Sequence, residues 1–403
     1  MFYLHSTRIS LCRTAHRPIL SCGACTACKL WCKIVLRHHT PSLKKDVRME
    51  HHSVQANPPE PMRIADTFAL KPGLMGFAAL WIFVFHVWQP MLGGVPVLGR
   101  LESIIKYVGF AGVDIFFFLS GGGLVFSMQK GSVWCFYKRR LERILIPFLI
   151  MAVCYALYQH WSVGLFFARI SGVYFYTKSM YGFLWYVPAI LTLYLFFPAY
   201  YALFSRSKHR SLFLFVVLTV WLALSILLKN TLREDFYGFT NRIPIFLIGV
   251  YCGQKMKDGD DILPRWFPLA AGIMLLIGVF LAYLTNVMKM ELLFPVSNAA
   301  FPNILLTLGI VFLVPWFAKR VIRRELSPIQ KFFGFFGSIS LAFYCTQELL
   351  YYIYRDVVGL HHPALDNLAL ILLITAASLL LSKVSDWLLQ LFKRISPAKK
   401  TDS

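Results

Sequence analysis

The sequence predicts an all-α integral membrane protein, a bundle of about ten transmembrane helices with both termini in the cytoplasm. Three observations lead to this prediction. Of the 403 residues, 58% are hydrophobic and only 15% are charged. The apolar residues form long continuous windows, and the Lys and Arg residues are concentrated in every second loop between these windows. The net charge of +22 does not indicate nucleic-acid binding, because such a protein would carry many more charges. A disordered chain is excluded because so much apolar surface cannot stay solvated.

Ten apolar windows qualify as membrane spans, since crossing about 30 Å of hydrocarbon takes roughly 20 helical residues. They are 74–93, 104–128, 144–161, 184–204, 211–228, 239–256, 266–285, 301–317, 338–354 and 364–382. The stretch 163–177 is apolar but is interrupted by Arg169 and Gly172, which is typical of a re-entrant or interfacial segment.

The cations set the orientation of these spans. With a cytoplasmic N-terminus, 32 of the 41 Lys and Arg residues fall on the cytoplasmic side and nine fall outside. Cytoplasmic loops carry the excess of Lys and Arg in membrane proteins. We therefore expect both termini in the cytoplasm and a multi-pass protein of the cell membrane, plasma or inner.

The sequence divides into three parts. Residues 1–69 form a basic, cysteine-rich tail, 70–392 form the transmembrane domain, and 393–403 form a basic cytoplasmic tail. Within the first part, Cys22, Cys25, Cys28 and Cys32 have the C-x2-C-x2-C-x3-C spacing of bacterial ferredoxins. Met49 and Met62 offer internal starts. The segment is therefore an over-extended translation start, a disordered tail, or an iron–sulfur or zinc site.

Ionisable groups inside spans are costly, so each one is a functional candidate. His86 lies in the first span, about 12 residues or roughly 18 Å from its cytoplasmic end. Asp114 lies in the second span, about seven to ten residues below the outer end. If these spans are neighbours, the carboxylate of Asp114 can orient the His86 imidazole as a general base for a hydroxyl group. The alternatives are an interhelical hydrogen bond for His86 and a structural ion pair for Asp114.

A basic run precedes the third span, and within it Arg140 and Arg143 are three residues apart. On a helix they share a face and can clamp phosphates. The alternative is an anchor that binds lipid headgroups. Ser120 begins the run Ser120–Gly123, whose glycines favour close helix packing at the inner end of the second span.

Taken in order, these motifs resemble those of the acyltransferase-3 family of multi-pass membrane acyltransferases. The motifs that carry the resemblance are His86 in the first span, Gly112-Val-Asp114 with Ser120-Gly121, Arg140-x-x-Arg143 before Pro147, Leu184-Trp185-Tyr186-x-Pro188, and Arg242-x-Pro244-x-Phe246-x-x-Gly249. Two positions depart from the family pattern. Met75 stands where the family has Arg, and Gln347 stands where His is common.

The resemblance implies transfer of an acyl group, usually acetyl from cytoplasmic acetyl-CoA or another acyl-CoA, to a hydroxyl of a glycan or lipid-linked saccharide. His86 and Asp114 would be catalytic. Arg140, Arg143 and Ser120 would bind the donor, and Lys71 would replace the missing Arg. The residues that would contact the acceptor are Trp185, Tyr186, Arg242 and Gln347. The bilayer, the acyl-CoA and the saccharide are the expected partners, with no metal and no nucleic acid.

Two other functions fit the same sequence. A transporter or exporter of an acylated glycan or small organic acid could use the same scaffold, although the spans show no paired inverted repeats. A signalling protein that senses ligands through its outer loops is the third alternative, and those loops are short.

Overall fold

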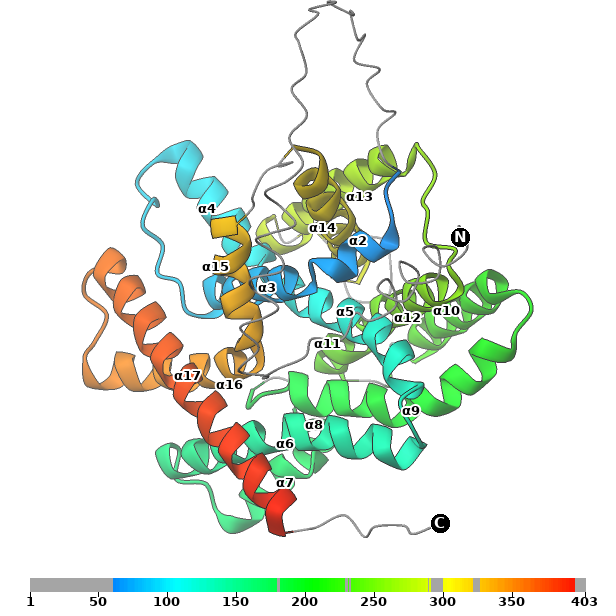
Figure 1. The fold of residues 1–403 in the computed structure, drawn as a ribbon. Coiled ribbons are helices and arrows are strands. Elements are labelled where there is room, and N and C mark those ends of the chain that lie inside the picture. The colour runs from blue at the N-terminus through cyan, green and yellow to red at the C-terminus, as the bar shows by residue number, and fades with distance from the viewer. Residues whose placement is uncertain are drawn as a thin grey trace, which may run out of the picture. The chain divides into compact units, whose positions relative to one another are not determined.

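A computed structural model describes residues 61–179, 182–228, 231, 233–288, 290, 300–321 and 327–395. Within these residues the chain is built from helices, with one isolated antiparallel bridge between Arg63 and Ile262 (Figure 1). The all-α prediction is therefore confirmed for the described chain. The predicted cysteine-rich segment with Cys22–Cys32 lies outside the described residues.

In chain order the helices are α2 (Ile64–Ala69), α3 (Lys71–His86), α4 (Pro96–Val108), α5 (Ala111–Met128), α6 (Val133–Tyr158), α7 (Val163–Ile170), α8 (Val173–Thr177), α9 (Tyr186–Arg206), α10 (Arg210–Leu227), η2 (Glu234–Phe236), α11 (Tyr237–Thr240), α12 (Ile243–Asp258), α13 (Phe267–Ala282), η3 (Tyr283–Val287), α14 (Ala300–Val321), α15 (Ser327–Ser338), α16 (Ser340–Val357) and α17 (Pro363–Ile395).

Among the described residues, seven helices are long and apolar enough to cross a membrane: α5, α6, α9, α10, α13 with the start of η3, α14 and α17. Each of the ten predicted windows overlaps a helix. However, α3 and α12 have 16 residues each, and α16 carries Glu348, Arg355 and Asp356. A helix of this length spans about 24 Å, less than the hydrocarbon core. Multi-pass membrane character is confirmed, while the number ten and the orientation stay predictions.

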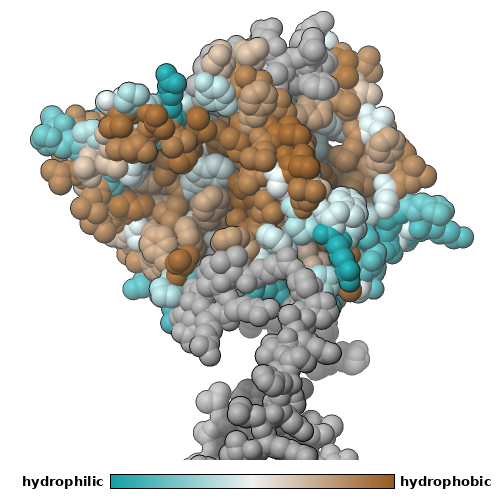
Figure 2. All heavy atoms as spheres, turned by 90° about the horizontal axis from the view of Figure 1, so that it is seen from above, coloured by the Kyte–Doolittle hydropathy of each residue, from teal (hydrophilic) through white to brown (hydrophobic). Residues whose placement is uncertain are grey.

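The outer surface of the molecule agrees with a membrane environment. Figure 2 shows hydrophobic residues over most of one face, with hydrophilic residues mainly at its margins. The helices differ in how they contribute to this surface, because most residues of α5 are buried whereas few residues of α10 and α13 are. In a bilayer the exposed side chains of α10 and α13 contact lipid. Helix α5 is thus the centre of the bundle, and α10 and α13 belong to its periphery.

Two predicted boundaries shift in the structure, and the interrupted segment 163–177 forms two short helices. The window 104–128 is divided into α4 and α5, because the backbone turns at Gly109, where a Cβ atom would lie 2.6 Å from the Trp81 carbonyl oxygen. Helix α6 begins at Val133, eleven residues before the predicted window, so Arg140 and Arg143 belong to the helix itself. The segment 163–177 forms α7 and α8, separated by the left-handed Gly172.

Residues 64–69 were predicted as part of the tail, but they form α2 and pack against the transmembrane helices. Thr67 donates a hydrogen bond from Oγ1 to the carbonyl oxygen of Val311 at 2.7 Å. Asp66 forms an ion pair with Lys319 on α14 at 3.2 Å. The structured part of the chain therefore begins before residue 70.

Helices α5 and α12 pack backbone to backbone through glycines. A Cβ atom at Gly249 would lie 2.2 Å from the Phe118 carbonyl oxygen, and one at Gly121 would lie 2.3 Å from that of Phe246. Small residues of this kind let transmembrane helices approach closely. This packing fixes α5, which carries Asp114 and Ser120, relative to the start of α12, where Arg242 lies.

We expect Gly249→Ala to destabilise the protein, because the added methyl group forces α5 and α12 apart. Overpacking of this type costs about 1–3 kcal/mol. The measurement is the midpoint of thermal unfolding in detergent. Gly272→Ala on α13 is the control, since a Cβ atom there meets nothing within 4 Å. Equal unfolding midpoints for the two variants would contradict the expectation.

Candidate functional site

A cavity of about 210 Å³ lies among α3, α5, α6, α9 and α16, and five predicted site residues line it. These five are Lys71, Ser120, Arg140, Arg143 and Tyr186. They come from four different helices and are up to 115 positions apart in the sequence. We call this space the cationic cavity. The structure thus brings together all four predicted donor-binding residues and one predicted acceptor-binding residue.

Three cations gather at one end of the cationic cavity. Arg140 and Arg143 lie three positions apart on α6, and Lys71 begins α3. The Lys71 Nζ donates to the Leu119 carbonyl oxygen at 3.3 Å, and the Arg140 guanidinium lies 5.8 Å from the centre of the Tyr194 ring. No acidic side chain is among the described residues that line the cavity. Uncompensated positive charge in a recess with low-dielectric walls attracts anions.

Met75 also lines this cavity, one helical turn after Lys71 on the same helix. Pro72 does not interrupt α3, because a proline in the first turn has no intrahelical hydrogen bond to lose. Lys71 therefore stands on the same helical face as the position where the resembled family carries Arg. The structure places a cation at this wall, but one turn earlier than the family pattern does.

The middle of the cavity is polar without being charged. Ser120 lies against Tyr186, whose backbone N–H donates to the hydroxyl of Tyr344 at 3.2 Å. The rings of Tyr186 and Tyr344 meet edge to face, 5.4 Å apart. Edge-to-face packing holds aromatic rings in a defined geometry. Helices α5, α9 and α16 are therefore held together by these contacts in the cavity wall.

His86 stands one turn beyond the cavity on α3, since Ile82 is part of the cavity wall. Its Nδ1 lies 3.2 Å from the amide nitrogen of Gln347, and its Nε2 lies 3.7 Å from a carboxylate oxygen of Glu348. Both partners belong to α16. The amide contact fixes the ring orientation, and the carboxylate can stabilise an imidazolium ion.

The expected pairing of His86 with Asp114 does not occur. Asp114 is fully buried and faces Arg242, with 3.6 Å between Oδ1 and Nε. The Arg242 guanidinium in turn lies 5.7 Å from the centre of the Trp185 ring. The depth estimate placed the two residues at similar levels, but the α5–α12 packing turns the carboxylate toward α12. The structural alternative for Asp114, a partner of a cation, is the one observed.

Glu348 was not singled out from the sequence. It is the one acidic residue within the predicted window 338–354, and a carboxylate inside a span is a functional candidate by the same rule that selected His86. The neighbouring Gln347 is the predicted site residue, because it stands where the family commonly has His. The structure shows that both residues contact the same imidazole ring.

The predicted acceptor-binding residues are divided among three places. Tyr186 lines the cationic cavity and Gln347 contacts His86. Trp185 and Arg242 lie together at the buried carboxylate of Asp114.

Among the described residues, no group of three or more His, Cys, Asp and Glu side chains is arranged to hold a metal ion.

Comparison with known proteins adds a family match. The model of the acyltransferase-3 family, described as an acyltransferase domain, matches residues 73–385. Acyltransferase MdmB from Streptomyces mycarofaciens is 37% identical over 86 residues, which are 20% of this chain and 22% of that protein. The matched segment thus spans about a fifth of the length of this relative. No solved structure matches the chain significantly.

Proposed function

Because the chain belongs to the acyltransferase-3 family, we propose that it is a membrane O-acyltransferase with acyl-CoA, most simply acetyl-CoA, as its donor. The acyl group would pass to a hydroxyl of a cell-surface or lipid-linked saccharide, and the reaction would take place in the plasma or inner membrane. The observation that supports this proposal is the cationic cavity, which extends along α3 toward His86.

The cationic end suits the donor. Coenzyme A carries several phosphate groups, and Lys71, Arg140 and Arg143 supply three cations without a competing carboxylate among the lining residues. Guanidinium groups bind phosphate oxygens in pairs, which gives both affinity and orientation. Under the predicted topology this end faces the cytoplasm, where acyl-CoA is made. Ser120 and Tyr186 are then placed along the path of the pantetheine arm.

The histidine end suits the chemistry. From Lys71 to His86 the helix rises by about 22 Å, so an extended donor that is held by its phosphates presents its thioester near His86. In the proposed reaction His86 takes the proton of the acceptor hydroxyl, and the oxygen attacks the thioester carbonyl. The carbon–sulfur bond breaks, and the thiolate of coenzyme A leaves and is protonated. Glu348 stabilises the imidazolium ion that forms on His86.

The test is transfer of labelled acetyl from acetyl-CoA to envelope saccharides by the purified protein in liposomes. We expect Arg143→Gln to raise the KM for acetyl-CoA about tenfold, the effect of about 1.4 kcal/mol from one lost charge-assisted contact. The value of kcat should stay nearly constant, because Arg143 is remote from His86.

Lys138→Gln is the matched control, since Lys138 lies in the same basic run but pairs with Glu142 away from the cavity. Equal KM values for the two variants would show that Arg143 does not hold the donor. If the wild-type protein moves a labelled glycan across the bilayer without turning over acetyl-CoA, the transporter alternative is correct instead.

A further inference from the structure

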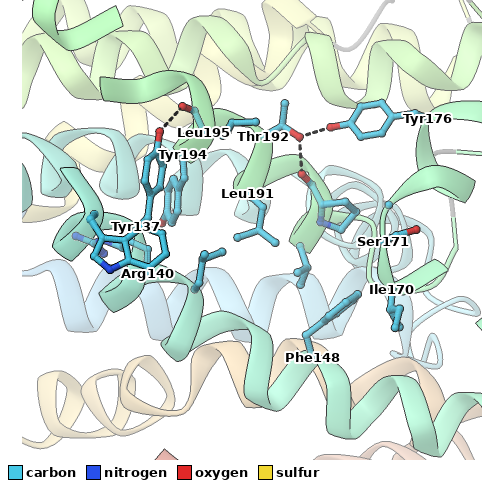
Figure 3. A pocket seen from close by; sticks show the side chains of 15 residues that line it. Tyr137, Arg140, Phe148, Ile170, Ser171, Tyr176, Leu191, Thr192, Tyr194 and Leu195 are labelled. Atoms are coloured by element: carbon cyan, nitrogen blue, oxygen red, sulfur yellow. Dashed lines mark hydrogen bonds between the residues drawn. The ribbon is translucent and has the colours of Figure 1, made fainter. Parts of the chain in front are cut away.

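A second cavity, of about 400 Å³, lies between α6 and α9 and is closed at one side by the α7–α8 segment. We call it the apolar groove. Figure 3 shows Tyr137, Arg140 and Tyr194 at one end of it, Leu191 and Thr192 in the middle, and Ile170, Ser171 and Tyr176 at the other end. Its volume is within the range of small-molecule sites, which runs from about 300 to 1,000 Å³.

The polar groups of the apolar groove are already engaged with one another. The Tyr137 hydroxyl donates to the Leu195 carbonyl oxygen at 2.7 Å, and Thr192 bonds both the Tyr176 hydroxyl and the Pro188 carbonyl oxygen. Ser171 donates to the carbonyl oxygen of Ala168. A saccharide would find few free partners here. The walls suit a hydrocarbon chain, which needs no hydrogen-bond partners.

The groove opens on the lipid-facing side of the bundle. Leu195 at its rim is 61% exposed and Trp134 is 74% exposed, and both α6 and α9 qualify as membrane spans. Next to Leu195, Phe196 is also exposed on α9. In a bilayer such side chains contact lipid tails, and a tryptophan at a helix end is typical of the headgroup level. A lipid chain can therefore enter the groove sideways.

Positive charge stands at one end of the same groove. Arg140 lines it, and Lys138 and Arg139 belong to the same turn of α6. An apolar channel that ends at a cationic group complements an anionic amphiphile. Juxtamembrane clusters of Lys and Arg attract anionic lipids in the same way.

Arg140 and Tyr194 line both cavities, so they form the wall between the apolar groove and the cationic cavity. We propose that the apolar groove holds one hydrocarbon chain of an anionic bilayer phospholipid, whose phosphate contacts Arg140, and that this lipid weakens donor binding in the cationic cavity. The two ligands share one guanidinium, and their phosphates repel each other across the wall. The lipid site stands on the groove alone, whereas the coupling rests on the proposed function.

The test uses the full chain in nanodiscs of phosphatidylcholine, with or without phosphatidylglycerol. Native mass spectrometry should show phosphatidylglycerol retained by the protein in the absence of donor. Calorimetry should show coenzyme A bound about fivefold more weakly in the mixed nanodiscs, which corresponds to about 1 kcal/mol. If phosphatidylglycerol is not retained, the lipid site is wrong. If coenzyme A binds with equal affinity in both nanodiscs, the coupling between the two sites is wrong.

Variants separate this effect from a general response to surface charge. Leu191→Trp fills the middle of the groove, and Leu195→Trp covers its rim at an exposed position that does not disturb the fold. Both should lose the retained phosphatidylglycerol and bind coenzyme A equally well in the two nanodiscs. Leu203→Trp is the control, because Leu203 is exposed on the same helix but lines neither cavity.

If Leu195→Trp and Leu203→Trp retain the lipid equally, the groove is not its site. If the wild-type protein binds no coenzyme A in either nanodisc, the proposed function fails and the coupling fails with it. Lipid retention, which is measured without donor, still decides the lipid site by itself.

Discussion

His86→Ala is expected to lower kcat for acyl transfer by about 10²–10⁴-fold, the usual contribution of a positioned general base. The affinity for acyl-CoA should be unchanged, because His86 stands one turn beyond the cationic cavity and does not line it. The measurement is the rate of labelled acetyl transfer at saturating donor, together with calorimetric binding of coenzyme A.

Two further variants make this prediction sharp. His209→Ala removes an exposed histidine before α10 that makes no side-chain cap, and it should leave kcat unchanged. Glu348→Gln keeps the shape of the partner of His86 but removes its charge, so it should lower kcat by a smaller factor. If His86→Ala retains wild-type transfer, the proposed mechanism is wrong. If it loses coenzyme A binding instead, His86 has a structural role.

The helices could be predicted because a helix that crosses the hydrocarbon core of a bilayer needs a long apolar segment. Such segments can be recognised from the hydropathy of the sequence alone. The placement of Arg140 and Arg143 on one helical face also follows from their spacing. Their meeting with Lys71, Ser120 and Tyr186 around one cavity was implied only by the family resemblance, since it depends on how four helices pack. Local spacing carries no information about such contacts.

The partners of the buried charges could not be predicted for the same reason. His86 lies more than 260 residues before its two partners, Gln347 and Glu348, so nothing in the local sequence indicates these contacts. Asp114 was assigned to His86 from depth alone, and depth does not specify the direction of a side chain around its helix axis. That direction is set by the glycine contacts between α5 and α12, where backbones touch.

Asp114→Ala is expected to produce the largest loss of stability among single substitutions at the site. Asp114 is fully buried and Arg242 is 6% exposed, with the carboxylate oxygen 3.6 Å from the guanidinium. Removing the carboxylate leaves the buried Arg242 cation facing the Trp185 ring without its charged partner. Breaking a buried pair in this way costs about 3–5 kcal/mol. The measurement is unfolding in detergent by heat or chaotrope, followed by intrinsic fluorescence.

Two comparisons distinguish an unpaired charge from a simple loss of packing. The double variant Asp114→Leu with Arg242→Met removes both charges and should recover much of the stability, because apolar replacements of a buried pair are often neutral. Asp356→Ala removes an exposed carboxylate that pairs with Arg355 and accepts a hydrogen bond from the Tyr158 hydroxyl, and it should cost much less stability because solvent screens exposed pairs. If Asp114→Ala unfolds like the wild type but loses acyl transfer, the carboxylate acts in the chemistry, and its assignment as a structural partner of Arg242 is wrong. If the double variant is less stable than Asp114→Ala, the Arg242 guanidinium stabilises the fold without the carboxylate. Trp185 rather than Asp114 is then the main partner of Arg242.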